Sequence, residues 1–267
     1  MATIGLIAGG GRFPLLFAES ARRAGHRVIA VAHSSEADPA LEKLVDAITW
    51  IKLGQIGHLL DGLKAGGAQQ TVMLGSITKR RFFADAMLDA TGVRLLARVA
   101  VRSDDNLLRT FATFLDEQGM PIVDPTPFLQ DRLAREGVMG RHAPSDDELA
   151  DARYGLELAR GIGRLDLGQT VVVKNRVGVA VEALEGTDAC VRRGGELARD
   201  GFTVVKAVKP GQDRRFDLPA VGPDTIDTLR EANGRVLAVE AGSTLVMDLD
   251  RMIEKADKAK IVLLGIR

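Results

Sequence analysis

The chain has 267 residues, of which 46 % are hydrophobic and 27 % are charged, the composition of a folded globular protein with enough apolar material for a core. Its 36 basic side chains balance its 36 acidic ones and aromatic residues make up 4 %, which argues against a nucleic-acid-binding protein. The single cysteine, Cys190, excludes an intrachain disulfide and fits a reducing compartment. No run of about 18 apolar residues predicts a membrane-spanning helix, and the short apolar start lacks the basic region of a signal peptide.

The N-terminal half alternates short apolar runs with amphipathic stretches. We expect helices at 13–24 and 55–65, and strands at 3–8, 27–32, 47–51 and 71–74. Strands that alternate with helices indicate a mainly parallel sheet with crossover connections. Residues 79–135 are expected to be mostly helical, with a helix capped at Asp104–Asn106 that runs through Gln118, and with a brief strand at 122–123.

The C-terminal half begins after a segment that breaks both periodicities. Two glycines and a proline make 137–145 a predicted linker, and Ser145 to Glu148 form a capping box that opens a helix. A hairpin around Asn175–Arg176 is expected from strands 170–174 and 177–181. Further elements are expected at 187–199, 203–208, 223–232, 236–239, 247–256 and 261–264.

The predicted fold class is therefore α/β, with two α/β domains joined by a linker. The N-terminal domain, 1–136, is expected to be Rossmann-like with a parallel sheet. The C-terminal domain, 146–267, is expected to combine a mixed sheet with helices and to carry a catalytic loop.

A glycine turn follows the first strand. Gly9, Gly10 and Gly11 precede Arg12 and a helix that starts at Phe13. Free N–H groups at such a helix start can bind a phosphate. The pattern matches neither the dinucleotide fingerprint nor the P-loop, and a tight turn that needs positive φ is the alternative.

A second candidate site lies where the 177–181 strand ends. Glu182 and Glu185 leave that strand, Thr187 is placed as the N-cap of the next helix, and Asp188 and Arg192 follow in that helix. Carboxylates beside a helix start can hold a cation, and arginine can pair with phosphate. The alternative is a capped helix with an exposed Asp188–Arg192 ion pair. Cys190 is expected to be packed rather than nucleophilic.

A long loop at 209–225 is the most unusual segment, because loops of this length are mostly functional or disordered. Its prolines stiffen it, which favours a preorganised site. Its acids are oxygen ligands of the kind that Mg²⁺ accepts, and the nearby cations suit phosphate. The residues concerned are Lys206, Lys209, Gln212, Asp213, Arg215, Asp217, Asp224 and Thr225. The alternative is a solvated surface loop.

Glu240 ends a later strand in the same way as Glu182 follows an earlier one. An acid at the carboxyl end of a strand lies where open α/β sheets bind ligands. Glu240 is therefore a candidate metal ligand or base, with an ordinary edge carboxylate as the alternative. The four histidines show no metal-ligand spacing and are interpreted as structural or surface residues.

These motifs together resemble the metal-dependent UDP-2,3-diacylglucosamine pyrophosphatases of lipid A biosynthesis, a family unrelated to the calcineurin-like phosphoesterases. The resemblance spans nearly the whole chain. It is carried by the opening 5–14 and, more specifically, by the segments Glu182–Asp188, Arg192–Gly195, Lys209–Thr225 and Val239–Gly242.

The resemblance implies hydrolysis of UDP-2,3-diacylglucosamine to UMP and 2,3-diacylglucosamine 1-phosphate (lipid X), with Mg²⁺ as cofactor and water attack on the β-phosphorus. It implies two domains that close on the substrate, and peripheral work at the cytoplasmic face of the inner membrane. The essential aspartate is placed at Asp224, with Asp213 and Asp217 as neighbours and Lys209 beside them. The metal ligands are sought among Asp224, Asp213, Glu185 and Glu240, and Lys174 is added to the cations that can meet phosphate.

The acyl chains need an apolar groove, which we expect in the domain cleft, with the stretch 82–88 as an alternative. A homodimer is one option for the oligomeric state, and no nucleic-acid partner is expected. A nucleotide-dependent oxidoreductase and a noncatalytic lipid or nucleotide carrier are the rival functions.

Overall fold

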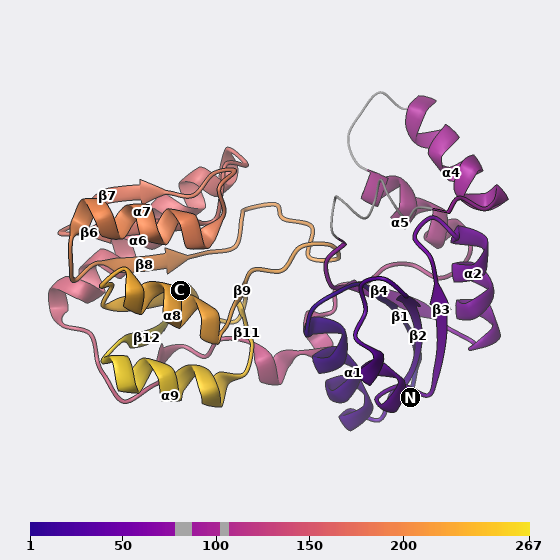
Figure 1. Ribbon diagram of the computed structural model, residues 1–267, viewed down its shortest axis with the longest axis horizontal. Helices are drawn as coiled ribbons and strands as arrows, with labels where there is room; N and C mark the ends of the chain where they lie inside the picture. Colours follow the sequence, from indigo (N-terminus) through magenta and orange to yellow (C-terminus); the bar gives the residue numbers. More distant parts are fainter. Residues whose placement is uncertain (78–86, 102–106) are drawn as a thin grey trace. The chain divides into compact units, whose positions relative to one another are not determined.

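The computed structural model describes residues 1–77, 87–101 and 107–267 (Figure 1). The chain divides into two compact units. Unit 1 comprises Met1–Leu129 with Arg214–Phe216, and unit 2 comprises Gln130–Asp213 with Asp217–Arg267. Among the described helices, none has the length and apolar character needed to cross a membrane.

Unit 1 is built on a four-stranded parallel sheet in the order β3-β2-β1-β4. This is the strand order of one half of a doubly wound sheet, so the predicted Rossmann-like parallel sheet is confirmed. The central strand β1 is buried along almost its whole length, which is why it reads as an unbroken apolar run. The elements are β1 (Thr3–Ala8), α1 (Phe13–Arg23), β2 (Arg27–His33), η1 (Pro39–Lys43), β3 (Ala47–Ile51), α2 (Ile56–Ala65) and β4 (Gln70–Leu74).

The rest of unit 1 contains the helices α4 (Ala90–Val101) and α5 (Leu107–Glu117) and the short 3-10 helix η2 (Thr126–Phe128). Ile122 pairs with Thr71 in a parallel bridge, in agreement with the expected brief strand. The expected cap at 104–106 lies outside the described residues. The expectation of helix up to 135 is wrong beyond α5, because three prolines between 121 and 127 prevent a regular helix there.

Unit 2 is built on a six-stranded mixed sheet in the order β5-β12-β10-β8-β6-β7. Strands β8, β10 and β12 are parallel, whereas β6 is antiparallel to both of its neighbours. The predicted mixed sheet is thus confirmed. The elements are η3 (Gln130–Arg132), β5 (Gly137–Val138), α6 (Asp146–Arg164), β6 (Thr170–Lys174), β7 (Val177–Val181), α7 (Thr187–Ala198), β8 (Thr203–Lys206), β9 (Ala220–Val221), α8 (Pro223–Glu231), β10 (Val236–Glu240), β11 (Leu245–Val246), α9 (Leu249–Ala259) and β12 (Val262–Ile266).

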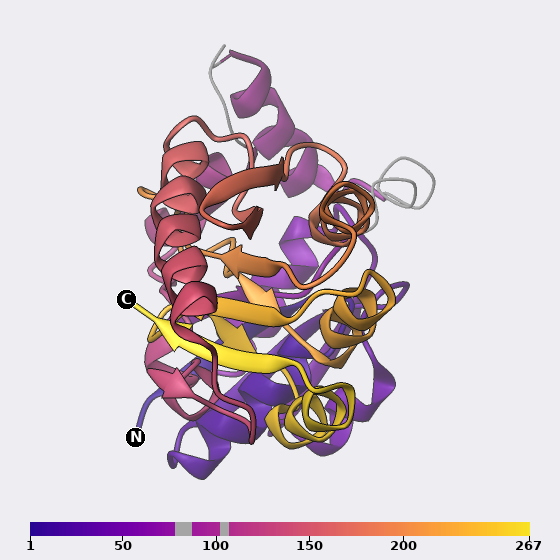
Figure 2. The same cartoon turned by 90° about the vertical axis from the view of Figure 1, so that its left-hand side faces the viewer.

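The sheet of unit 2 is covered on both faces, as Figure 2 shows: α6 lies on one face and α7, α8 and α9 on the other. Successive side chains of each strand pack into different cores. In β6, Val172 packs with the α7–α9 side, while Val171 and Val173 pack with the α6 side. Glycine lets α7 approach closely, because a Cβ on Gly194 would lie 2.5 Å from Val172 Cγ2.

The segment predicted as a linker, 137–145, begins inside this sheet. Strand β5 pairs antiparallel with Leu264 and Gly265 of β12. The chain passes β12 so closely that a Cβ on Gly265 would lie 1.8 Å from Arg135 O. The predicted capping box is confirmed at the start of α6, where Ser145 N donates to Glu148 Oε2 (2.7 Å) and Glu148 N donates to Ser145 Oγ (3.3 Å).

The hairpin β6–β7 turns at Asn175 and Arg176, as predicted. Both residues have left-handed backbones, with φ of 54° and 58°. This is the geometry of a type I′ turn, which prefers Asn followed by Gly. The carboxylate of buried Asp151 accepts both turn N–H groups, from Asn175 (2.9 Å) and Arg176 (2.6 Å).

We therefore expect Arg176→Gly to stabilise the protein by about 0.5–1 kcal/mol, because the left-handed conformation costs a side-chain-bearing residue about 1–2 kcal/mol and glycine much less. The N–H that Asp151 accepts is retained. Urea denaturation measures the change. Arg192→Gly, at an exposed site inside α7, is the control and should destabilise by about 1 kcal/mol. Destabilisation by both variants would contradict the prediction.

Candidate active site at the carboxyl edge of the second sheet

Four polar residues meet at one edge of the sheet of unit 2. Lys206 ends β8, Glu240 ends β10, Glu182 follows β7, and Thr170 opens the antiparallel strand β6. Thr170 lies opposite Lys206 in the strand register, and Glu182 N donates to Thr170 O (2.9 Å). Because the ligands of α/β sheets bind at the carboxyl ends of the parallel strands, this edge is the candidate site.

A buried hydrogen-bonded network at this edge links Lys206 and Glu182 through Thr187, the first residue of α7. Lys206 Nζ donates to Thr187 Oγ1 (3.1 Å), and Thr187 Oγ1 donates to Glu182 Oε1 (2.9 Å). The second oxygen of Glu182 accepts from Gln169 N (3.1 Å). Lys206 is 8 % exposed and Glu182 is 7 % exposed. We call this set the Lys206–Thr187–Glu182 network.

Burial changes the pKa of Lys206. Desolvation lowers the pKa of its ammonium group, while the carboxylates of Glu182, Asp217 and Asp188 act in the opposite direction. An ammonium group has three N–H donors. Within the described part of the chain it makes only the hydrogen bond to Thr187, so two donors remain for a ligand. A cation in such a low-dielectric place attracts a phosphate oxygen more strongly than an exposed one.

Two of the predicted metal ligands are bound to cations of the protein itself. Both oxygens of Glu240 are used, one by Arg160 Nη2 (2.6 Å) and one by Val208 N (2.8 Å). Glu185 pairs with Arg193 (2.5 Å) and also accepts from Ala183 N (3.1 Å). The hydrogen bond from Arg193 lowers the pKa of Glu185, so its charge serves a local ion pair.

Asp224 differs from these acids. It lies in the first turn of α8, its side chain is exposed, and it makes no hydrogen bond or ion pair with any described residue. Pro223 occupies the first helical position, and Thr225 Oγ1 accepts from Gly222 N (3.3 Å). Acidic side chains are favoured in the first turn of a helix, where backbone N–H groups have no partner within the helix. Asp224 is therefore the predicted acid that is open to a metal ion or a water molecule.

The first part of the long loop is cross-linked by its own side chains. Gln212 Oε1 accepts from Lys209 N (3.1 Å), and Gln212 Nε2 donates to Asp217 Oδ2 (2.5 Å). Lys209 Nζ pairs with Asp166 Oδ1 (2.8 Å). Asp213 is partly buried in the same loop, and its backbone O accepts from Asp217 N (3.2 Å). These contacts make the loop an ordered segment.

Arg215 belongs to the short part of the loop that is assigned to unit 1. Its guanidinium lies over the ring of Phe216, 5.1 Å from the ring centroid, and Phe216 packs against the core of unit 1.

Other predicted residues lie elsewhere or have other partners. Lys174 is at the opposite edge of the sheet, where its Nζ donates to Ala198 O (3.0 Å) and Asp200 O (2.7 Å) at the end of α7. The alternative ion pair between Asp188 and Arg192 is not among the interactions of the described residues, and both side chains are exposed. Helix α7 begins at Thr187, with Gly186 in the cap position that was predicted for Thr187.

The glycine turn of unit 1 is a place of close backbone contact. Gly9 N donates to Leu74 O (2.8 Å) and Gly10 N to Ser76 O (2.8 Å), and a Cβ on Gly9 would lie 2.7 Å from Ser76 O. These two N–H groups are therefore used within the fold. The predicted phosphate contact of this turn then depends on Gly11 and Arg12, which are exposed.

Sequence reasoning did not select three residues that build this edge. Arg160 lies near the C-terminal end of α6, Gln169 in the turn before β6, and Thr170 in β6 itself. Cys190 is buried, as expected, and burial raises the pKa of its thiol to about 12, so it is not a thiolate near neutral pH.

Among the described residues, no group of three or more His, Cys, Asp or Glu side chains could hold a metal ion. Magnesium is often bound by one or two carboxylates together with phosphate oxygens of the substrate. A single open carboxylate at Asp224 fits that mode, whereas a protein-only site built from Asp224, Asp213, Glu185 and Glu240 does not form.

The fold and the site define a two-unit α/β protein with a buried cation and an open acid that suit a phosphorylated ligand. The model of the LpxI N-terminal domain matches residues 3–132, and the model of the LpxI C-terminal domain matches residues 135–264. The chain belongs to the LpxI family. A relative described as UDP-2,3-diacylglucosamine pyrophosphatase LpxI, from Caulobacter vibrioides, is 34 % identical over 277 residues, which cover 100 % of this chain and 98 % of the relative.

Solved structures show only weak likeness. A biotin carboxylase complex from Campylobacter jejuni gives a TM-score of 0.30 at 13 % identity and covers 73 % of this chain and 42 % of that one. An N5-carboxyaminoimidazole synthetase from Staphylococcus aureus gives a TM-score of 0.25 at 16 % identity and covers 65 % and 37 %. This chain thus spans less than half of either protein.

The buried network yields a stability prediction. Glu182→Gln should destabilise unit 2 by about 1–3 kcal/mol, because buried Lys206 loses the carboxylate that balances it. Glu185→Gln is the matched control; it removes an acid of an exposed ion pair and should leave the unfolding midpoint nearly unchanged. Urea unfolding of both variants measures the difference, and equal midpoints would contradict the role given to the network.

Proposed function

We propose that this protein hydrolyses the pyrophosphate bond of UDP-2,3-diacylglucosamine to UMP and 2,3-diacylglucosamine 1-phosphate, a step of lipid A biosynthesis. The observation that carries the proposal is full-length membership of the LpxI family, with a relative that bears this activity in its name. The site chemistry supports it, because a pyrophosphate needs cations for its oxygens and an acid that can orient water or metal.

Within this proposal, the buried ammonium of Lys206 donates its two remaining N–H groups to phosphate oxygens. The hydrogen bond to Thr187 (3.1 Å) and the carboxylate of Glu182 hold that ammonium in place. Asp224 orients the attacking water or binds the metal ion from the N-terminus of α8. Lys209, Gln212 and the other polar residues of the loop form the wall of the phosphate site.

We propose Mg²⁺ as the cofactor, held by Asp224 and by pyrophosphate oxygens. When bound, it neutralises charge that develops on the phosphate groups. Glu185 and Glu240 remain with their arginine partners in this proposal, which restricts the protein ligands to the loop acids. Asp213 and Asp217 are the alternatives to Asp224 for this role.

Asp224→Asn tests the assigned acid. We expect kcat to fall at least about 100-fold, the size of effect seen when one group that stabilises a transition state is removed, while substrate binding is retained. Asp250→Asn is the matched control, because Asp250 is also an exposed acid in the first turn of a helix, α9. Release of UMP with Mg²⁺ present is the readout. Activity near that of the unmodified protein would exclude Asp224 and favour Asp213 or Asp217.

Hydrolysis in ¹⁸O-water locates the attacked phosphorus. Attack on the β-phosphorus breaks its bond to the bridging oxygen, which leaves with UMP, so the label should appear in the sugar 1-phosphate. Label in UMP alone would refute β-attack. A purified protein that leaves the substrate intact with Mg²⁺ or Mn²⁺ would refute the proposed activity itself.

We also propose that the enzyme works as a peripheral protein at the cytoplasmic face of the inner membrane, where its diacylated substrate resides. The oxidoreductase alternative has less support, because the glycine turn lacks the dinucleotide pattern and uses two of its N–H groups within the fold. A noncatalytic carrier would bind substrate without turnover, and the UMP assay separates it from an enzyme.

A further inference from the structure

An apolar cavity of about 290 Å³ lies in unit 1, whereas the polar edge described above belongs to unit 2. Its walls come from the sheet and from three helices. Ile7 and Met73 belong to the sheet, Leu59 to α2, Leu95 to α4 and Phe111 to α5. The volume is near the lower end of the range for small-molecule pockets, about 300–1,000 Å³, so the cavity has room for one slender ligand group.

The described residues that line this cavity carry no charge. His33 is the one polar side chain among them, and the others are aliphatic, aromatic, methionine or glycine. Burial lowers the pKa of His33, with Glu36 acting in the opposite direction, so the ring is neutral near pH 7. Its Nδ1 is buried without a hydrogen-bond partner among the described residues. Such a lining cannot solvate a phosphate, a sugar or a base, and it favours a hydrocarbon chain.

The mouth of the cavity is also apolar. Leu88, Leu96 and Leu108 line the cavity and are 49 %, 39 % and 37 % exposed, and Ile77 is 38 % exposed. Apart from Met1, Met87 and Val93, every exposed large hydrophobic side chain that the structure describes in unit 1 lines this cavity. Exposed apolar groups concentrated in one place indicate a binding surface rather than chance exposure.

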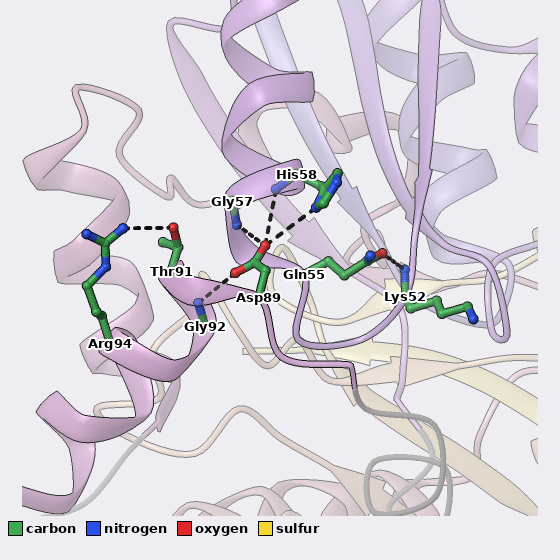
Figure 3. Close-up of polar contacts among 8 residues, drawn as sticks. All are labelled: Lys52, Gln55, Gly57, His58, Asp89, Thr91, Gly92 and Arg94. Atoms are coloured by element: carbon green, nitrogen blue, oxygen red, sulfur yellow. Dashed lines mark hydrogen bonds and ion pairs between the residues drawn. The ribbon is translucent and has the colours of Figure 1, made fainter.

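Hydrogen bonds and close backbone contacts hold the wall of this cavity together. The carboxylate of Asp89 accepts hydrogen bonds from Gly57 N (2.6 Å) at the start of α2 and from Gly92 N (2.8 Å) in α4, as Figure 3 shows. Partial burial disfavours the ionised form, but the backbone donors outweigh it and lower the pKa of Asp89. A Cβ on Gly92 would lie 2.4 Å from Gly54 O, so α4 begins directly against the turn before α2.

We propose that this cavity binds one fatty acyl chain of the diacylated substrate. The inference rests on the proposed function, which supplies a ligand with two hydrocarbon chains and gives the cavity an occupant of matching chemistry. Burial of each methylene favours binding, so even part of one chain adds substantially to it. The cavity is too small for two chains, and its neutral lining selects the chain over the headgroup.

A fluorescent fatty acid, dansyl-undecanoic acid, tests the cavity without requiring turnover. It should bind the full chain saturably at one site. Leu96→Glu places a carboxylate at the mouth, which must stay hydrated and should weaken binding at least about tenfold. Val93→Glu is the matched control, because Val93 is 54 % exposed on the same helix, α4, but does not line the cavity. Binding to this control should be unchanged.

The source of the chain is tested by displacement. The diacylglucosamine 1-phosphate product should displace the probe, whereas UMP and glucosamine 1-phosphate, which lack acyl chains, should not. Equal binding by the unmodified protein and Leu96→Glu would overturn the proposal, as would displacement by either compound that lacks acyl chains. The proposal would also be overturned if the unmodified protein and Val93→Glu sedimented as dimers but Leu96→Glu sedimented as a monomer. This face would then contact a second copy of the chain.

Different results would contradict acyl-chain binding by the cavity and the proposed hydrolase function. A protein that releases UMP from the substrate, yet binds the probe no better than Leu96→Glu does, contradicts the cavity alone. A protein that binds the probe at one site but releases no UMP contradicts the hydrolase, and leaves fatty acyl binding by this cavity in place.

Discussion

Parallel strands impose the constraint on which the rest of this structure depends. Each parallel strand must be followed by a crossover that returns the chain to the same starting edge. In unit 2, this brings the carboxyl ends of β8 and β10 to one edge, together with the exit of β7. Lys206, Glu240 and Glu182 meet there although long stretches of sequence separate them, because each follows or ends a strand of the same direction.

The most important chemical consequence of this strand arrangement is the burial of Lys206. A buried ammonium is costly unless hydrogen bonds and nearby carboxylates compensate it. Thr187 and Glu182 provide that compensation in the structure, and the other two donors of the ammonium group make no hydrogen bond with a described residue. This edge therefore holds a buried cation, and the same unit has an open acid in Asp224 at the start of α8, whereas Glu185 and Glu240 are neutralised by Arg193 and Arg160.

The candidate binding sites of the two units differ in their chemistry. Unit 2 concentrates charge at the ends of its strands, and unit 1 contains an uncharged cavity between its sheet and its helices. Glycine has a structural purpose in both. Gly92 and Gly9 allow backbones to come within contact distance, and Gly194 lets α7 lie directly on β6. Because these segments are in direct contact, a larger side chain at one of these glycines would change the width of a cavity or the position of a helix start.

Local sequence patterns determined much of the fold. The apolar runs located the strands because buried strands need continuous hydrophobic side chains. The Asn175–Arg176 turn and the Ser145 capping box were also readable from sequence, because both depend on residues close together in the chain. The long motifs from Glu182 to Gly242 were enough to indicate the family, and hence the expectation of a pyrophosphate substrate.

Tertiary structure decided how the polar side chains are used. The sequence shows Glu185 and Glu240 as acids at strand ends, but not that Arg193 and Arg160 already occupy them. It shows Lys174 and Lys206 as similar lysines, yet antiparallel β6 places Lys174 at the opposite edge. The cavity of unit 1 was equally hidden, since its lining comes from β1, β2, β4, α2, α4 and α5. Local propensity acts over a few residues, whereas pairing, burial and cavity shape arise only when distant segments pack together.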